Sequence, residues 1–198
     1  MKEALGIKPD MPAAVLLLGH AEFLSGARDQ AMIDYDKALV ADRELAGDIR
    51  LQENLREAIK WAVSRDKAAV LLAAYGGTAG TDFLKGLANS ALTDGEVRRS
   101  ARQALVDTNN EAHVDWLTSL TADFNELTKC KQRREVIEQM AKTGNTGFLP
   151  LLEDYRPVKV KKGAFGKSKL TNACIGDAVE AAILVLTGGR VDAGAPKP

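Results

Sequence analysis

The sequence predicts an all-α fold built from stacked antiparallel helix pairs. Apolar residues make up 45% of the 198-residue chain, which is enough to bury a core. Only 5% of the residues are aromatic, whereas alanine and leucine recur throughout, and this composition favours helices over a β-sandwich or barrel. No segment shows the sustained apolar–polar alternation between hairpin turns that indicates strands. In addition, Ala4-Leu5 recurs 34 residues later as Ala38-Leu39, which indicates an internal repeat.

The first helix pair is expected in residues 15–41. One helix begins near Val15, a turn follows at residues 25–28, and a second helix comes after it. In this second helix Ala31, Tyr35 and Ala38 share one face, because they are spaced i, i+4 and i+7. The small alanines should let the two helices approach closely, and Tyr35 should fill the gap between them.

This pair resembles the tetratricopeptide repeat, a helix-turn-helix unit of the same period. The residues that carry the resemblance are Leu18, Gly19, Ala31, Tyr35 and Ala38. The chain departs from the family where Val15 replaces a tryptophan and Glu22 a tyrosine, and the closing proline is kept at Pro9 but is Arg43 in the next repeat. The resemblance implies a tetratricopeptide-like domain at residues 1–45 whose first repeat is truncated. The sequence therefore suggests a fragment of a longer protein.

Three further helices are expected before residue 93. The first spans residues 48–64, with Ile49, Leu51, Leu55, Ile59 and Trp61 as its apolar residues. The second spans residues 67–75 and ends at a glycine C-cap formed by Gly76-Gly77. Thr81-Asp82 should cap the third, with Phe83, Leu84, Leu87 and Leu92 pointing inward.

The next segment resembles the second helix of a HEAT repeat. Its matching residues are Asp94, Val97, Arg98, Ala101, Ala104 and Leu105, in the family's order. The resemblance implies that Asp94 and Arg98 form a polar ladder between neighbouring repeats while the alanines and the leucine pack. It also implies HEAT-like repeats over residues 46–190 and, with the first repeat, a right-handed α-solenoid.

The remaining helices are expected at residues 114–127, 131–142, 148–155 and 170–186, before a disordered tail at residues 191–198. Two cysteines do not make a disulfide framework, so Cys130 and Cys174 are expected to be buried free thiols.

Charge and hydropathy exclude several classes of function. Lys+Arg and Asp+Glu each number 27, so no chain-wide charge favours nucleic acid or an anionic membrane. The longest apolar run, residues 13–18, is too short to span a bilayer, and no signal-type core opens the chain. The sequence therefore predicts a cytoplasmic protein with no membrane partner.

No motif predicts catalysis, a metal site or a cofactor. His20 and His113 have no cysteine or histidine neighbours at ligand spacing. The segment Gly166-Lys167-Ser168 resembles the end of a phosphate loop, but Lys161 stands where that loop needs its first glycine. We therefore expect a chain that is not an enzyme.

Two groups of residues are candidates for binding a partner. Leu16, His20 and Phe23 share a face of the first helix, and chaperone-docking tetratricopeptide repeats carry a lysine and asparagine carboxylate clamp at the positions of Leu16 and His20. An apolar face here would take a hydrophobic or amphipathic segment, or would simply pack against an upstream repeat. Both interpretations remain open.

The second candidate is the acid-free stretch 156–169. Its cations are Arg156, Lys159, Lys161, Lys162, Lys167 and Lys169. Such a stretch suits an acidic or phosphorylated protein partner, or it is a solvated loop that only keeps the surface soluble. Nucleic acid is not expected, because Phe165 alone gives little support for base stacking.

The sequence thus predicts a non-catalytic protein–protein interaction scaffold. The resemblance suggests helical arrays of the kind found in bacterial signalling proteins, including Ser/Thr kinases. The alternative is a regulatory segment that docks onto an enzyme domain of its own polypeptide.

Overall fold

The computed structural model describes residues 11–160 and 169–189 of the chain. Their regular secondary structure is helical apart from two strands of two residues each, so the fold class is all-α. Its contacts divide it into two compact units, unit 1 (Met1–Val114) and unit 2 (Asp115–Pro198). The division falls at residue 114, whereas the sequence suggested a boundary near residue 45. The predicted disordered tail, residues 191–198, and Pro9 lie outside the described residues.

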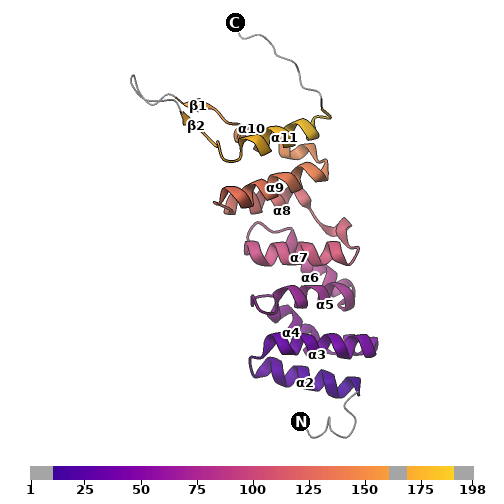
Figure 1. The fold of residues 1–198 in the computed structure, drawn as a ribbon. Helices are drawn as coiled ribbons and strands as arrows, with labels where there is room; N and C mark the ends of the chain where they lie inside the picture. Colours follow the sequence, from indigo (N-terminus) through magenta and orange to yellow (C-terminus); the bar gives the residue numbers. More distant parts are fainter. Residues whose placement is uncertain (1–10, 161–168, 190–198) are drawn as a thin grey trace. The chain divides into compact units, whose positions relative to one another are not determined.

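Unit 1 is a succession of packed helices (Figure 1). Its α-helices are α2 (Pro12–Leu24), α3 (Arg28–Ala41), α4 (Ile49–Ala58), α5 (Arg65–Tyr75), α6 (Gly77–Ala88) and α7 (Gly95–Asp107), and its short 3-10 helices are η1 (Arg43–Gly47) and η2 (Glu111–His113). Consecutive helices pack on one another: α2 on α3, α4 on α5, and α6 on α7. Helix α5 also contacts α6 and α7.

The close approach of α2 and α3 is confirmed. Ala31, Tyr35 and Ala38 are all fully or almost fully buried. The Tyr35 ring lies directly against Gly19 of α2, where a Cβ atom would come within 2.6 Å of the ring. Glycine is required at this contact for the space it leaves. The small–large–small pattern of α3 therefore sets how the first two helices pack.

Helix α7 buries the alanines and the leucine of its sequence pattern, whereas the hydrogen bonds described for the side chains of Asp94 and Arg98 lie within residues 90–98. The Asp94 side chain accepts hydrogen bonds from the Glu96 and Val97 backbone N–H groups and so caps the helix. Ala101, Ala104 and Leu105 are buried, as expected. Arg98 is fully buried, and its Nη1 donates to the Thr93 carbonyl at 2.7 Å.

The helix expected at residues 48–64 ends early, at Ala58. The Ser64 hydroxyl donates to the Ala58 carbonyl at 2.8 Å, and the Arg65 side chain donates to the Ile59 carbonyl at 3.1 Å. These bonds satisfy carbonyls that a longer helix would have paired, so the chain turns there. Trp61 belongs to this turn and is 45% exposed, with the Arg28 guanidinium 4.1 Å from its ring centroid.

Two other positions expected to be apolar contacts are exposed. Ile49, at the first position of α4, is 76% exposed. Leu92 is 98% exposed, because α6 runs from Gly77 to Ala88 and Leu92 falls in the turn after it. The prediction that Leu92 points inward is wrong.

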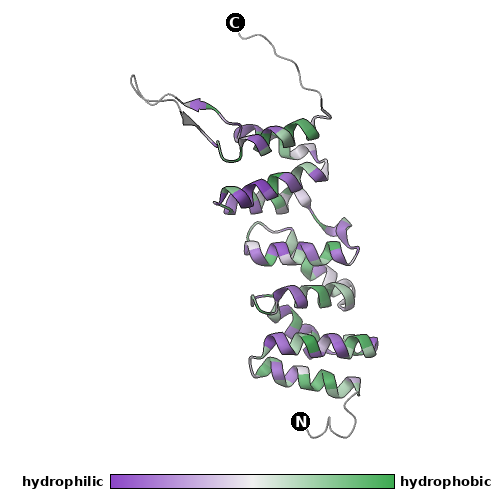
Figure 2. Cartoon of the chain, in the orientation of Figure 1, coloured by the Kyte–Doolittle hydropathy of each residue, from purple (hydrophilic) through white to green (hydrophobic). Residues whose placement is uncertain are grey.

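Unit 2 contains α8 (Trp116–Glu126), α9 (Cys130–Thr143), η3 (Thr146–Phe148), α10 (Leu149–Asp154) and α11 (Gly176–Leu186). These helices share one core, which is formed by Leu120, Phe124, Val136, Ile137, Met140, Phe148, Leu152, Ile175, Val179, Ala182, Ile183 and Leu186. Figure 2 shows hydrophobic and hydrophilic residues side by side on the same helices, and α9 is largely hydrophilic. The helices of unit 2 are therefore amphipathic, with their apolar sides buried.

A short hairpin interrupts the helices of unit 2. Strands β1 (Lys159–Val160) and β2 (Lys169–Leu170) pair antiparallel, with Lys159 opposite Leu170. The helix expected at residues 170–186 accordingly begins only at Gly176. The stretch after β2 is a turn, and it contains Cys174.

Candidate functional site

The three residues proposed for an apolar binding face lie inside unit 1. Leu16 and His20 are each 5% exposed and Phe23 is 9% exposed. None of them presents an open surface to a partner in this structure. Their burial argues against an open apolar face, and the contacts described for His20 are with Tyr35, Asp48 and Asn54, which follow it in the chain.

His20 belongs to a buried polar network between α2, α3 and α4. Its Nε2 lies 3.4 Å from the Asp48 carboxylate, so this nitrogen carries the proton and donates. Its Nδ1 accepts from the Tyr35 hydroxyl at 2.9 Å, and the Asn54 amide donates to the Tyr35 oxygen at 2.6 Å. When the His20 imidazole is neutral, each of these three contacts therefore joins a hydrogen-bond donor to an acceptor.

Burial shifts the titration of both aromatic members of this network. Desolvation lowers the pKa of His20 below 6.5, although the nearby Asp48 carboxylate acts in the opposite direction. Desolvation also raises the pKa of Tyr35 to about 12. Both groups are therefore neutral at pH 7, and their hydrogen bonds link α2, α3 and α4.

A cavity of about 450 Å³ lies between α3 and α5. It is lined by Met32, Ile33, Asp36, Lys37, Asp66, Lys67, Val70 and Leu71. Three of the four charged side chains are engaged locally: Lys37 pairs with Asp34, Lys67 pairs with Asp29, and Asp66 accepts from the Ser100 hydroxyl. The remaining lining residues are apolar, apart from Asp36.

Few of the cations predicted to bind a partner fall within the described residues. Lys159 is exposed on β1, whereas Lys161, Lys162 and Lys167 lie outside the described residues. The backbone of Lys169 pairs with that of Val160 in the hairpin, but the Lys169 side chain is not described. Arg156 is compensated, because it pairs with Glu153 at 3.0 Å and with Glu180 at 3.3 Å.

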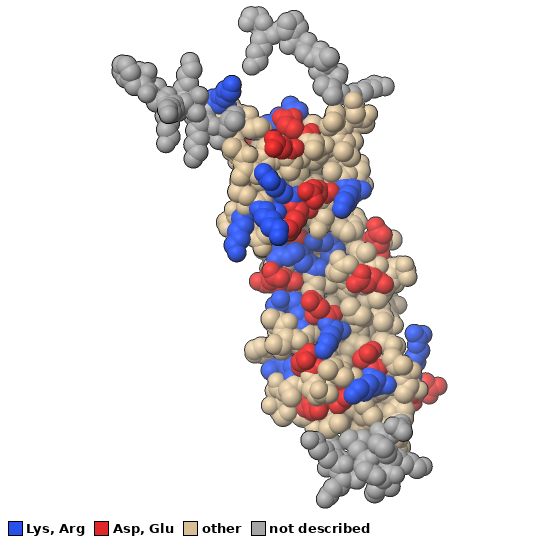
Figure 3. Space-filling model, viewed as in Figure 1, with Lys and Arg blue, Asp and Glu red and all other residues tan. Residues whose placement is uncertain are grey.

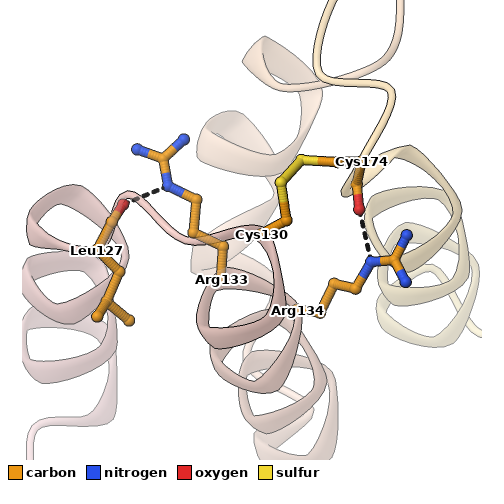
Figure 4. Close-up of a disulfide and its surroundings, with 5 residues drawn as sticks. All are labelled: Leu127, Cys130, Arg133, Arg134 and Cys174. Atoms are coloured by element: carbon orange, nitrogen blue, oxygen red, sulfur yellow. Dashed lines mark hydrogen bonds between the residues drawn. A yellow bond between two sulfur atoms is a disulfide. The ribbon is translucent and has the colours of Figure 1, made fainter.

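The expectation of buried free thiols is wrong: Cys130 and Cys174 form a disulfide with a Cα–Cα distance of 5.8 Å (Figure 4). Both cysteines are exposed. Cys130 is the first residue of α9, and Cys174 lies in the turn between β2 and α11. The sequence placed Cys174 in an apolar helix, but α11 starts two residues later, and the preceding turn brings its sulfur to α9.

Beside this disulfide lies a second group of cations that the sequence analysis missed. Lys129, Lys131, Arg133 and Arg134 fall in residues 127–134, which contain no acid. Both lysines and Arg134 are exposed, and Arg133 is half-buried. None of the four forms an ion pair with another described residue. Figure 3 shows blue side chains gathered over the start of α9.

We define the basic surface of unit 2 as Lys129, Lys131, Arg133 and Arg134 together with Lys159 of the hairpin. The disulfide ties the start of α9 to the turn that follows β2, so it links these two parts of the chain covalently. Residues 127–134 and 156–169 together hold ten of the 27 Lys and Arg residues of a chain with zero net charge. A scan for acid-free runs would have found residues 127–134 in the sequence.

Backbone carbonyls hold the two arginines of this surface. Arg133 Nε donates to the Leu127 carbonyl at 2.6 Å, and the guanidinium lies 4.9 Å from the Phe124 ring centroid and 5.5 Å from that of Tyr155. Arg134 Nε donates to the Cys174 carbonyl at 2.5 Å. Figure 4 shows the two guanidinium groups on either side of the disulfide, each with its terminal nitrogens pointing away from the helix.

No family profile, curated protein or solved structure matches the chain. Within residues 11–160 and 169–189, no group of three or more His, Cys, Asp or Glu side chains could hold a metal ion. No helix among these residues is both long and apolar enough to cross a membrane.

Proposed function

We propose that the chain is a non-catalytic protein-interaction scaffold that binds an acidic or phosphorylated segment of a partner protein through the basic surface of unit 2. The observation that carries this proposal is the concentration of exposed cations without ion-pair partners around the Cys130–Cys174 disulfide. Uncompensated charges of one sign on a neutral chain create a local field that favours an oppositely charged partner.

The strength of such a contact depends on several charges acting together. A single exposed ion pair contributes only about 0–1 kcal/mol, and salt screens it over about 8 Å at physiological ionic strength. An arginine can contribute more binding free energy than a single exposed ion pair, because its planar guanidinium can donate two parallel hydrogen bonds to one carboxylate or phosphate. Binding should therefore be salt-sensitive and should depend on several residues of the surface.

The helix pairs would serve as the frame of this scaffold. Successive packing of α2 to α7, the Gly19–Tyr35 contact and the Asp94 cap of α7 support the proposal of tetratricopeptide-like and then HEAT-like repeats in a right-handed α-solenoid. Repeat stacks of this kind build extended surfaces that suit protein partners.

The compartment in which the protein works bears on this proposal. A cytoplasmic location remains a prediction from the sequence. Because reducing compartments keep thiols reduced, the Cys130–Cys174 bond would be open there and closed in an oxidising compartment. The redox state of the surroundings would then decide whether the turn after β2 is covalently linked to α9.

Charge reversal tests the proposal. The triple variant Lys129→Glu, Lys131→Glu and Lys159→Glu alters the basic surface, and Lys142→Glu is the control, because Lys142 is an exposed residue in the last turn of the same α9. The probes are a fluorescein-labelled Glu/Ser peptide and its phosphoserine form, and their anisotropy is measured at about 0.05 M and about 0.2 M salt.

We expect saturable binding that weakens with salt. The triple variant should lose affinity at least about tenfold, while Lys142→Glu should stay within about twofold of the unaltered protein. The proposal is refuted if neither peptide binds the unaltered protein, or if the triple variant and the control bind equally well.

A further inference from the structure

Arg133 and Arg134 are neighbours in sequence, but different parts of unit 2 hold them. Arg133 is fixed by the Leu127 carbonyl before α9 and by the rings of Phe124 and Tyr155. Arg134 is fixed by the carbonyl of Cys174, a residue 40 positions away. The position of Arg133 is therefore independent of the turn after β2 (residues 171–175), whereas that of Arg134 depends on this turn.

In each case the anchoring bond uses Nε and leaves the end of the guanidinium free. Neither arginine forms an ion pair or another hydrogen bond with the described residues. The two terminal nitrogens of each side chain can then donate together to one carboxylate or phosphate. Because Nε is already bound, less side-chain freedom is lost when a ligand binds.

The disulfide joins Cys174, whose carbonyl holds Arg134, directly to α9. The turn from Thr171 to Ile175 bonds to the hairpin through Thr171 N–H to the Val158 carbonyl and closes on itself through Ile175 N–H to the Asn172 carbonyl. Cys174 is exposed, and its described bonds to α9 are the disulfide and the hydrogen bond from Arg134. Once the disulfide opens, the hydrogen bond from Arg134 is the remaining described bond between Cys174 and α9, while the neighbouring Ile175 stays buried in the core of unit 2.

We infer that Arg133 and Arg134 are two contact points for one extended acidic segment that lies across the Cys130–Cys174 disulfide, and that opening this disulfide weakens binding by releasing Arg134. This inference rests on the proposed function and names the residues that select the partner and the bond that regulates it. Their placement on either side of the disulfide matches a segment with acidic groups at two positions (Figure 4).

The chemistry of the surface favours a polypeptide over a nucleic acid. Bases in single strands are held largely by stacking on aromatic side chains. The aromatic rings beside these arginines are Phe124 and Tyr155; Phe124 is buried in the core, and the guanidinium of Arg133 lies against Tyr155. Carboxylate and phosphate groups, in contrast, are the ligands that free guanidinium ends bind best.

The switch needs an external dithiol as reductant. Its thiolate attacks one sulfur of the disulfide and forms a mixed disulfide, and its second thiol then releases the protein. Cys130 and Cys174 each leave as a thiol, having gained two electrons and two protons in total, and the dithiol is oxidised to its own disulfide. Oxidation reverses the step.

The test compares single variants in the oxidised and the reduced protein. The variants are Arg133→Gln, Arg134→Gln and Arg134→Lys, and the reductant is dithiothreitol. Anisotropy of the labelled phosphoserine peptide gives the affinity, and a single-stranded oligonucleotide of equal charge is the second probe. Far-UV circular dichroism checks that each reduced protein keeps its helices.

In the oxidised state we expect each Arg→Gln variant to bind about tenfold more weakly, and Arg134→Lys to recover only part of the loss. Reduction should weaken binding to the unaltered protein by a similar factor. The reduced Arg133→Gln variant should bind more weakly than the oxidised Arg133→Gln variant by the same factor, whereas reduction of Arg134→Gln should change its affinity by less than about twofold. This non-additivity with Arg134 alone distinguishes release of one side chain from a general loss of structure.

Two results would overturn the inference, and only the first of them leaves the proposed function standing. In the first, the lysine charge reversals abolish binding, but reduction has no effect on affinity, or it weakens binding to Arg134→Gln by the same factor as binding to Arg133→Gln. In the other, the oligonucleotide binds more tightly than the peptide with the same arginine dependence. If reduction melts the helices, the oxidised Arg→Gln variants still decide, since unchanged affinity in both refutes the two contact points.

Discussion

Opening the Cys130–Cys174 disulfide should destabilise unit 2 and leave unit 1 unchanged. The bond closes a loop with a sequence separation of 44 residues. The entropy that such a cross-link removes from the unfolded chain corresponds to about 4 kcal/mol at 25 °C. If the hydrogen bond from Arg134 to the Cys174 carbonyl is lost as well, this adds up to about 1 kcal/mol.

The two tryptophans allow each unit to be followed separately. Trp61 belongs to unit 1, and Trp116 packs against the core of unit 2. In the Trp61→Phe variant, urea unfolding followed by fluorescence reports on unit 2, and in Trp116→Phe it reports on unit 1. Each is measured with and without dithiothreitol, and a Cys130→Ser, Cys174→Ser variant gives the cysteine-free reference.

We expect reduction to lower the free energy of unfolding reported by Trp116 by about 4 kcal/mol, which for a unit of this size corresponds to a fall in Tm of at least about 15 °C. The signal of Trp61 should not respond to the reductant, because neither cysteine belongs to unit 1. A change below about 1 kcal/mol at Trp116, or equal changes at both tryptophans, would refute the reasoning.

Two further predictions concern unit 1. Gly19→Ala should destabilise it by about 1–2 kcal/mol in urea unfolding, because the new methyl group lies 2.6 Å from the buried Tyr35 ring and the cost of overpacking exceeds the gain in helix propensity. Acidification should also destabilise unit 1: the unfolded chain protonates His20 near pH 6.5, whereas the folded chain, with its lowered pKa, resists protonation. Stability should therefore fall as the pH drops from about 6.5 through the folded pKa, and His20→Gln should flatten this part of the profile.

Each of these predictions has a matched control. Gly86 lies in α6 with nothing within 4 Å of the position of a Cβ atom, so Gly86→Ala should stabilise by up to about 1 kcal/mol. If Gly19→Ala does the same, the contact with Tyr35 is not tight. For the acid response the control is His113, which belongs to η2 and not to the buried network. If His113→Gln removes as much of the pH dependence as His20→Gln, burial of His20 is not its source.

Local patterns predicted well where a helix makes its contacts with its sequence neighbour. The spacing of Ala31, Tyr35 and Ala38 and the small Gly19 were enough to define the packing of α2 on α3. The burial of Ala101, Ala104 and Leu105 in α7 likewise follows the expected pattern, whereas the cap that Asp94 provides was not predicted. In both cases the stabilising groups lie within one helix or one helix pair.

The same patterns failed where a side chain interrupts a helix or finds a distant partner. The Ser64 hydroxyl, bonded to the Ala58 carbonyl, ends α4 in a stretch whose apolar spacing predicts continued helix. Leu92 continues the apolar pattern of α6 but falls beyond its end. Apolar spacing indicates which residues could be buried, and the position at which the helix ends decides which of them are buried.

The sequence by itself determined the all-helical class, because alanine- and leucine-rich amphipathic periodicity needs only local contacts to form helices. It also determined that the basic stretch of residues 156–169 carries no acid. Only the tertiary structure decided that Leu16, His20 and Phe23 are buried, and that Cys174 meets Cys130. Pairing across 44 residues depends on how the turn before α11 returns to α9, and helical periodicity carries no information about that return.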